Sequence, residues 1–312
     1  MKKLTNSFWA CISLVLCVSS CTESAEEPVP VNRFQEISIS ASIADDLLPD
    51  SRYTPVAGEY GDGSLATVLD WGIYEKGSKI PFIKSGDSNA PKAVLTESGF
   101  RLNIALDVTK QYDILLFAHS STQGRAPFTV NLTGYSENYR VTMNHHNDES
   151  PDRNDCFFAF EELSADNRAF SLRRPVAQLC VVTDEDLSKY DLSKLTTELK
   201  FVRAGTDEEF FVPEIDNQGI NHIDPVKFGV ENYTVQKASV HNGKTITYQG
   251  RRCRYLALDY IFEFVIEDGF DVLLTFKYNG ATLSTKRVYM GKGLHYASRW
   301  VIMPPSGKSL IE

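Results

Sequence analysis

The feature that most constrains the fold is a period of two in the apolar residues along many short segments. In FQEISISASI (34–43), three isoleucines and an alanine alternate with polar residues, and FRLNIALDV (100–108) repeats the pattern. Successive side chains of a β-strand point to opposite faces of a sheet. Each segment therefore predicts a strand with one buried and one exposed face.

Other apolar runs, bounded by turn residues, are typical of strands buried on both faces. They are YDILLFA (112–118), PVAQLCVVT (175–183) and YLALDYIFEFVI (255–266). Helical signals are few: DEDLSKYDLSKL (184–195) could hold a short helix with Asp184 as its N-cap. Many short strands without sustained helical periods predict an all-β chain built from sandwiches.

The strongest local signal is the dipeptide Asn279-Gly280 between two strand-like segments. Asn-Gly favours the positive φ angles of a type I′ turn, which connects two antiparallel strands. A two-residue loop would place Phe276 opposite Leu283 and Val272 opposite Arg287. We expect a β-hairpin here.

The length predicts two domains. Once the leader described below is removed, about 290 residues remain, which is more than a single sandwich commonly holds. The best candidate junction is DNQGINHIDP (216–225). We therefore expect an N-terminal β-sandwich domain over residues 33–215 and a C-terminal one over residues 216–312.

The N-terminus is typical of an export signal. Lys2 and Lys3 precede an apolar stretch, and Val18-Ser19-Ser20-Cys21 resembles the bacterial lipobox. The stretch is too short and too rich in serine for a permanent membrane span. We expect removal of residues 1–20 as a lipoprotein signal peptide, acylation of Cys21, and an extended tether over residues 21–32. The alternative is an ordinary secretory signal cut near the same place, with Cys21 unmodified.

The mature chain offers little for disulfide chemistry or polyanion binding. Cys156, Cys180 and Cys253 form no CxxC pair and cannot make a closed disulfide framework. The whole chain has a formal net charge of -9, and loss of the two leader lysines brings it to -11. Such a surface repels nucleic acid and anionic headgroups, so membrane attachment must come from the lipid.

No motif of a nucleotide-binding protein, metalloprotease or serine hydrolase occurs in the sequence. We therefore expect no enzyme activity, no cofactor and no metal. One acidic segment, HHNDESPDRND (145–155), could hold Ca²⁺ or a transition metal, but a solvated loop explains it better. Its potential ligands are His145, His146, Asp148, Glu149, Asp152 and Asp155.

Two arginine clusters could bind a carboxylate or phosphate. The first is Arg173-Arg174 before Pro175, and the second is Arg251, Arg252 and Arg254. We interpret both as exposed strand ends, because proline is tolerated at the first position of a strand and the surroundings are acidic.

The order of several segments resembles that of the fimbrillin-type lipoproteins of Bacteroidales. These segments are YDILLFA (112–118), CFFAF (156–160), LRRPVAQLCVVTDEDL (172–187), YLALDYIF (255–262), the hairpin, and GLHYASRWVIM (293–303). The resemblance covers essentially the whole mature chain. It implies two transthyretin-like, Greek-key β-sandwich domains and a stalk, anchor or tip accessory subunit of surface fimbriae.

The resemblance also implies how such subunits would assemble. A strand donated by one subunit would complete the sheet of another, because an open sheet edge carries unpaired backbone groups. The expected partners are other fimbrial subunits and, through the lipid, the outer membrane. The acidic TESAEE after Cys21 resembles the export tag of surface-exposed Bacteroidales lipoproteins.

Stalk subunits of this family are cleaved after an arginine that follows the first strand. Arg52 fits that position, and Arg33 is the second choice; an ordinary surface arginine is an equal alternative. The donor strand is harder to name, since Pro304 and Pro305 stop GLHYASRWVIM and the remaining tail is too short to span a sandwich. Either that strand moves out, or the protein ends a fibre.

Two other functional classes remain open. A surface glycan-binding lipoprotein would use the same export signal and sandwiches, with Trp71, Tyr74 and Trp300 as a sugar platform, although aromatics in strands more often pack in the core. An enzyme is the least supported class, because the carboxylates follow no recognisable spacing.

Overall fold

The computed structural model describes residues 33–43, 60–78, 80–120, 127–132, 140–143, 151–164, 166–209, 214–216, 245–262, 264–294, 299–305 and 307–311. Across these ranges the chain forms β-strands, with two short 3₁₀ turns, Pro151–Asn154 and Leu192–Lys194, and no α-helix. The all-β prediction is confirmed. No helix in this part of the chain is long and apolar enough to span a membrane.

The N-terminal sandwich packs two four-stranded sheets against each other. The first has the order β10-β1-β5-β4, with β10 Ala169–Leu172, β1 Phe34–Ile43, β5 Gly99–Asp107 and β4 Val94–Thr96. The second has the order β3-β2-β6-β9, with β3 Pro81–Lys84, β2 Ala66–Glu75, β6 Tyr112–Ser120 and β9 Cys156–Leu163. Trp71, Ile104 and Leu116 belong to the apolar cluster between these two sheets.

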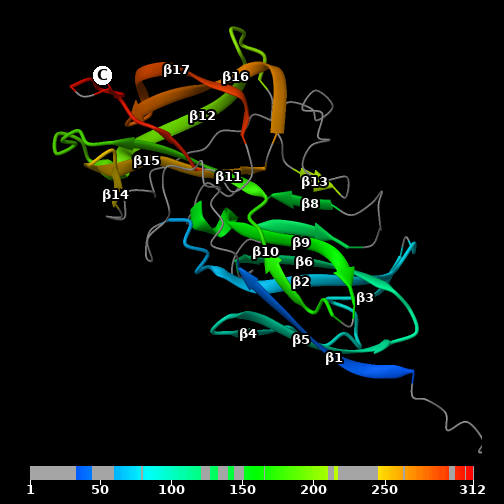
Figure 1. Ribbon diagram of the computed structural model, residues 1–312. Helices are drawn as coiled ribbons and strands as arrows, with labels where there is room; N and C mark the ends of the chain where they lie inside the picture. Colours follow the sequence, from blue (N-terminus) through cyan, green and yellow to red (C-terminus); the bar gives the residue numbers. More distant parts are fainter. Residues whose placement is uncertain are drawn as a thin grey trace, which may run out of the picture.

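The C-terminal sandwich also has two sheets, at the opposite end of the molecule (Figure 1). The first has the order β14-β15-β11-β18, with β14 Thr245–Tyr248, β15 Arg251–Phe262, β11 Val176–Thr183 and β18 Arg299–Ile302. The second has the order β12-β16-β17, with β12 Leu195–Arg203, β16 Phe264–Tyr278 and β17 Ala281–Leu294.

The sheet containing β2 and β6 is buried on both faces. Ile114 and Leu116 of β6 join the core of the N-terminal sandwich, whereas Leu115 and Phe117 join the larger cluster that continues into the C-terminal sandwich. A small sheet of β7 (Phe128–Asn131), β8 (Arg140–Met143) and β13 (Glu214–Asp216) lies between the two halves (Figure 1). The apolar core thus runs from one sandwich into the other.

Strand pairing divides the chain earlier than the expected boundary at residue 215. β11 pairs with β15 and β18, and β12 pairs with β16, so both strands share sheets with the C-terminal part of the chain. β10, which ends at Leu172, pairs with β1 instead. The division between the sheets therefore falls at residues 173–175. Most of the expected junction, residues 217–225, lies outside the described residues.

The expected hairpin is present, with a different register. Asn279 and Gly280 have φ angles of 51° and 78°, as a type I′ turn requires. However, a bulge shifts the pairing, so Phe276 faces Ser284 rather than Leu283. By the same shift Val272 faces Val288 rather than Arg287. One extra residue on one strand moves every later partner by one position.

The short helix expected over residues 184–195 is not formed. Only Leu192–Lys194 makes a 3₁₀ turn, and its N-cap is Asp191, whose side chain accepts from the Ser193 backbone N–H. Asp184 pairs with Arg251 instead. A competing charged partner explains why the N-cap prediction was wrong.

Candidate functional site

The first strand fills a gap in its sheet. β1 pairs antiparallel with β5 from Phe34 to Ala41 and parallel with β10 from Ser40 to Ile43. In the sheet order, β10 and β5 contact β1 and not each other. Removal of β1 would therefore leave unpaired backbone groups on β5 and on β10, and the two rows overlap where Ser40 and Ala41 now lie. Unpaired groups of this kind are what a donated strand satisfies.

The buried face of β1 matches the predicted alternation. Ile37, Ile39 and Ala41 are buried in the core of the N-terminal sandwich, and Ile43 is half-buried. Phe34, at the start of the strand, is exposed. The slot thus has an apolar floor for alternate side chains and polar edges for a backbone, which is what recognition of an added strand needs.

Gly99 at the start of β5 permits a very close approach of β1. Its φ is +123°, and a Cβ built on it would lie 2.2 Å from the carbonyl oxygen of Ala41. An open groove of about 250 Å³ adjoins this end of β1, with Ser42 and Ser98 in its lining. The end of β1 that leads toward residue 44 is therefore solvent-accessible.

The two predicted processing sites differ in what a cut would do. Arg33 is exposed and immediately precedes β1, and its carbonyl accepts a 2.9 Å hydrogen bond from the backbone N–H of Val108. Cleavage there would leave β1 attached to the rest of the chain. Arg52 lies outside the described residues, as does Cys21. Because Arg52 follows β1, a cut there would separate β1 from everything downstream.

The interpretation of Arg174 as an exposed strand end was wrong. Arg174 is 7% exposed; its Nε lies 2.7 Å from Asp155 Oδ1, and its Nη2 lies 2.9 Å from Asp155 Oδ2 and 2.7 Å from the carbonyl of Gly61. Burial opposes the charge, but the attraction and hydrogen bonds of Asp155 outweigh it and raise the pKa of Arg174. Asp155 is likewise not part of a solvated loop. Arg173, by contrast, is exposed as predicted.

A second buried arginine extends this polar junction. Arg299 of β18 donates from Nε to Oε1 of Gln178 and from Nη2 to the carbonyl of Tyr60. The Gln178 amide donates to the Tyr260 hydroxyl at 2.9 Å. The carbonyls of Tyr60 and Gly61 are thus held by one arginine each, directly after residues 44–59. This junction was missed in the sequence, where arginine and its distant partners give no local pattern.

Asp70, Ser85 and His119 form a polar cluster that the sequence did not reveal. Asp70 lies between the other two: its Oδ1 accepts from the Ser85 hydroxyl at 2.9 Å, and its Oδ2 is 3.0 Å from His119 Nε2. In a catalytic triad the hydroxyl bonds to the imidazole, with the carboxylate behind it. Here the serine bonds to the carboxylate, an arrangement that holds β2 to β6 and to the turn after β3.

The proposed sugar platform is not on the surface. Trp71 and Tyr74 are each 1% exposed, and the Tyr74 hydroxyl donates to the carbonyl of Leu132 at 2.8 Å. Trp300 is half-buried and packs against the larger core cluster. Packing in the core explains all three aromatics. A shallow groove of about 300 Å³ does carry a partly exposed aromatic, Phe160, near Arg173.

No group of three metal-ligating side chains occurs among the described residues. Of the acidic segment 145–155, only residues 153–155 have described side chains, and Asp155 is committed to Arg174. Cys156, Cys180 and Cys253 are all buried and unbridged.

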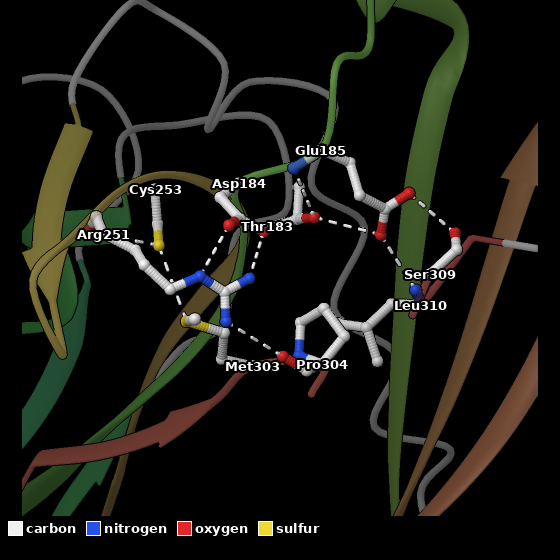
Figure 2. A network of polar contacts seen from close by, with 9 residues as sticks. All are labelled: Thr183, Asp184, Glu185, Arg251, Cys253, Met303, Pro304, Ser309 and Leu310. Carbon is white, nitrogen blue, oxygen red and sulfur yellow. Dashed lines mark hydrogen bonds and ion pairs between the residues drawn. The ribbon is translucent and has the colours of Figure 1, made fainter. Parts of the chain in front are cut away.

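The second arginine cluster is only partly exposed. Arg252 and Arg254 are exposed as predicted, but Arg251 is half-buried and its guanidinium pairs with the Asp184 carboxylate (Figure 2). The pKa of Asp184 is lowered mainly by its hydrogen bond with Arg251. The same guanidinium reaches the carbonyl of Pro304 at 3.4 Å, so this arginine ties the C-terminal segment to β15.

No family model matches the sequence. No curated protein matches it either. Solved structures with a related arrangement include a proposed adhesin of Bacteroides thetaiotaomicron VPI-5482, at 12% identity and a TM-score of 0.47 over 82% of this chain and 81% of that one. A proposed cell adhesion protein of Bacteroides ovatus ATCC 8483 gives 13% identity and a TM-score of 0.44 over 86% and 92% of the two chains. A structure described as proposed polysaccharide binding proteins of Bacteroides thetaiotaomicron VPI-5482 gives 9% identity and a TM-score of 0.41, over 80% of this chain and 79% of that one.

Proposed function

We propose that this chain is a structural or adhesive subunit of cell-surface fimbriae that accepts a strand from a neighbouring subunit. The observation that carries the proposal is the position of β1 between β10 and β5, two strands that do not pair with each other. The leader and Cys21 support export and lipid anchoring at the outer membrane. The similar structures bear adhesion-related names, and we extend that role to this chain only as part of this proposal.

Opening of the slot requires a cut between β1 and the rest of the chain. Arg52 is the only basic residue from position 44 to position 59. After a cut there, β1 would be held only by backbone pairing and by the burial of its apolar residues. A donated strand with the same alternation would replace it and satisfy both the backbone groups and the apolar floor.

The proposal is tested with purified chain that begins after Cys21. An Arg-specific protease should cut the folded protein at Arg52, and a mild denaturant wash should then release the β1 peptide. The cut protein should take up a labelled FQEISISASI peptide, whereas an Arg52→Lys variant, which resists the protease at this position and keeps the charge, should not. Failure of the cut and washed protein to take up the peptide, or equal uptake by uncut protein, would falsify the proposal.

Glycan binding remains a second candidate because of the groove beside Phe160 and Arg173. We propose it only as an added adhesive property of a fimbrial subunit. Glycan microarray binding that is lost in Phe160→Ala would support it. No saturable glycan binding would leave strand exchange as the function.

A further inference from the structure

The chain holds its own C-terminal segment at two points (Figure 2). Two adjacent residues after β11, Asp184 and Glu185, lie at the centre of this arrangement. Asp184 positions Arg251, which contacts the carbonyl of Pro304, and Glu185 contacts the chain at residues 309 and 310. This short loop therefore holds the segment after β18 at both ends, at Pro304 through Arg251 and at residues 309 and 310 directly.

The Glu185 carboxylate accepts hydrogen bonds from one side chain and one backbone N–H of the C-terminal tail, residues 307–311. Its Oε2 accepts from the Ser309 hydroxyl at 2.6 Å, and its Oε1 accepts from the Leu310 backbone N–H at 3.0 Å. Thr183 donates to the same Oε1 at 3.0 Å and orients the carboxylate. Hydrogen bonds to an ionised carboxylate are stronger than bonds between neutral groups, so one side chain binds two tail donors firmly.

The tail also buries apolar side chains. Leu310 is 7% exposed and Ile311 is 1% exposed, and both belong to the larger core cluster. The carbonyl of Leu310 accepts a 2.7 Å hydrogen bond from the Ser284 hydroxyl of β17. The tail therefore runs from β18, at the edge of one sheet, to β17, at the edge of the other.

The segment nearer β18 is held by sulfur and guanidinium contacts. Cys253 Sγ lies 3.5 Å from Met303 Sδ, and Arg251 reaches the next carbonyl, that of Pro304. β18 itself pairs with β11 over only four residues. Because this pairing is short, the anchors beyond β18 add to the buried contacts of Arg299 in holding this strand in its own sheet.

We propose that Glu185 and the apolar site beside β17 bind the chain's own C-terminal segment as an intramolecular ligand. This binding withholds β18 and the tail from exchange with a second copy. The withholding role rests on the proposed function, since strand exchange is the process that it prevents. The subunit would accept a strand at the β1 slot without donating one from its C-terminus.

The test of the bound tail uses the uncut, monomeric protein and therefore does not depend on fibre assembly. Carboxypeptidase should release Glu312, Ile311 and Leu310 slowly from the wild type, as followed by mass spectrometry. Glu185→Ala should accelerate the release of Leu310 at least tenfold. Asp186→Ala, in the same loop but hydrogen-bonded to Ser188, should release it at the wild-type rate. Equal rates in all three proteins would overturn the proposal.

If Glu185→Ala does not fold, Ser309→Ala provides the same test, because it removes one tail donor and leaves the carboxylate and Thr183 in place. Its release of Leu310 should be several-fold faster than that of the wild type, and an unchanged rate would overturn the proposal. For the withholding role, Glu185→Ala or Ser309→Ala is mixed with acceptor that has been cut at Arg52 and washed free of the β1 peptide. Light scattering should detect oligomers that the wild type does not form, and their absence overturns that role even where peptide uptake at the β1 slot succeeds.

Discussion

Arg174 and Asp155 form a buried, doubly hydrogen-bonded ion pair at the point where the sheets of the two sandwiches divide, with Nε–Oδ1 and Nη2–Oδ2 distances of 2.7 and 2.9 Å. The same guanidinium binds the carbonyl of Gly61. It also lies over the ring of Phe157, 4.9 Å from the ring centroid. One side chain at the start of the C-terminal half therefore ties together two segments of the N-terminal half, the chain at Gly61 and the chain at Asp155 and Phe157.

Removing the Asp155 carboxylate should lower the free energy of unfolding, because Arg174 would then be buried without its counter-ion. Asp155→Asn leaves a buried charge without its counter-ion, so we expect the free energy of unfolding to fall by about 3–5 kcal/mol. Glu162→Gln is the control, because its pair with Lys76 is half exposed and should contribute less than about 1 kcal/mol. Urea unfolding of both variants measures the difference, and similar losses would contradict a structural role for the buried pair.

Gly99 should control how well β1 fits its slot. Gly99→Ala would drive a methyl group against the carbonyl of Ala41, so we expect this variant to lose about 1–3 kcal/mol more than a matched control. Gly77→Ala is that control, since Gly77 also has a positive φ, +83°, but open space around it. Hydrogen exchange should accelerate at the β1 amides of Gly99→Ala alone. Equal protection of β1 in both variants would contradict the close approach.

Asp259 should make stability fall as the pH rises. Burial raises the pKa of this carboxyl well above its usual range. In the unfolded chain the pKa of an aspartate is about 3.9. Because the folded-state pKa of Asp259 is higher, this carboxyl contributes its full stability below about pH 3.9. The contribution is lost as the pH rises through the folded-state pKa. Asp259→Asn stays neutral and can still accept from the Tyr260 N–H. Its stability relative to the wild type should increase between pH 4 and pH 7 in urea titrations; a constant difference would contradict this.

The three cysteines should be inert in the folded protein. Burial raises the pKa of the Cys156 thiol well above its usual value, and that of Cys253 is raised for the same reason. Because the thiolate is the reactive form, a thiol reagent at neutral pH should label Cys156, Cys180 and Cys253 only after unfolding. Mass spectrometry of native and denatured samples of chain lacking Cys21 measures this. Rapid native labelling of Cys156 would contradict the buried position.

Part of the proposed site could be predicted from local patterns. The alternation in FQEISISASI identified β1 and its buried face, and Asn279-Gly280 identified the hairpin. The hairpin register could not be predicted from the turn, because a bulge beyond it skips Leu283 of β17 and shifts the pairing from Phe276 onward. Cys21 and Arg52 remain sequence predictions, since both lie outside the described residues.

The sequence by itself determined the all-β class, the first strand and the turn, because strand alternation and turn chemistry act between residues that are close along the chain. Tertiary structure alone decided that β1 lies between β10 and β5, that Arg174 is buried against Asp155, and that Glu185 binds the Leu310 backbone 125 residues away. The residues next to an arginine or glutamate in the sequence do not show whether its side chain is exposed or buried. Its partner is chosen only when distant strands pack and remove water from both groups.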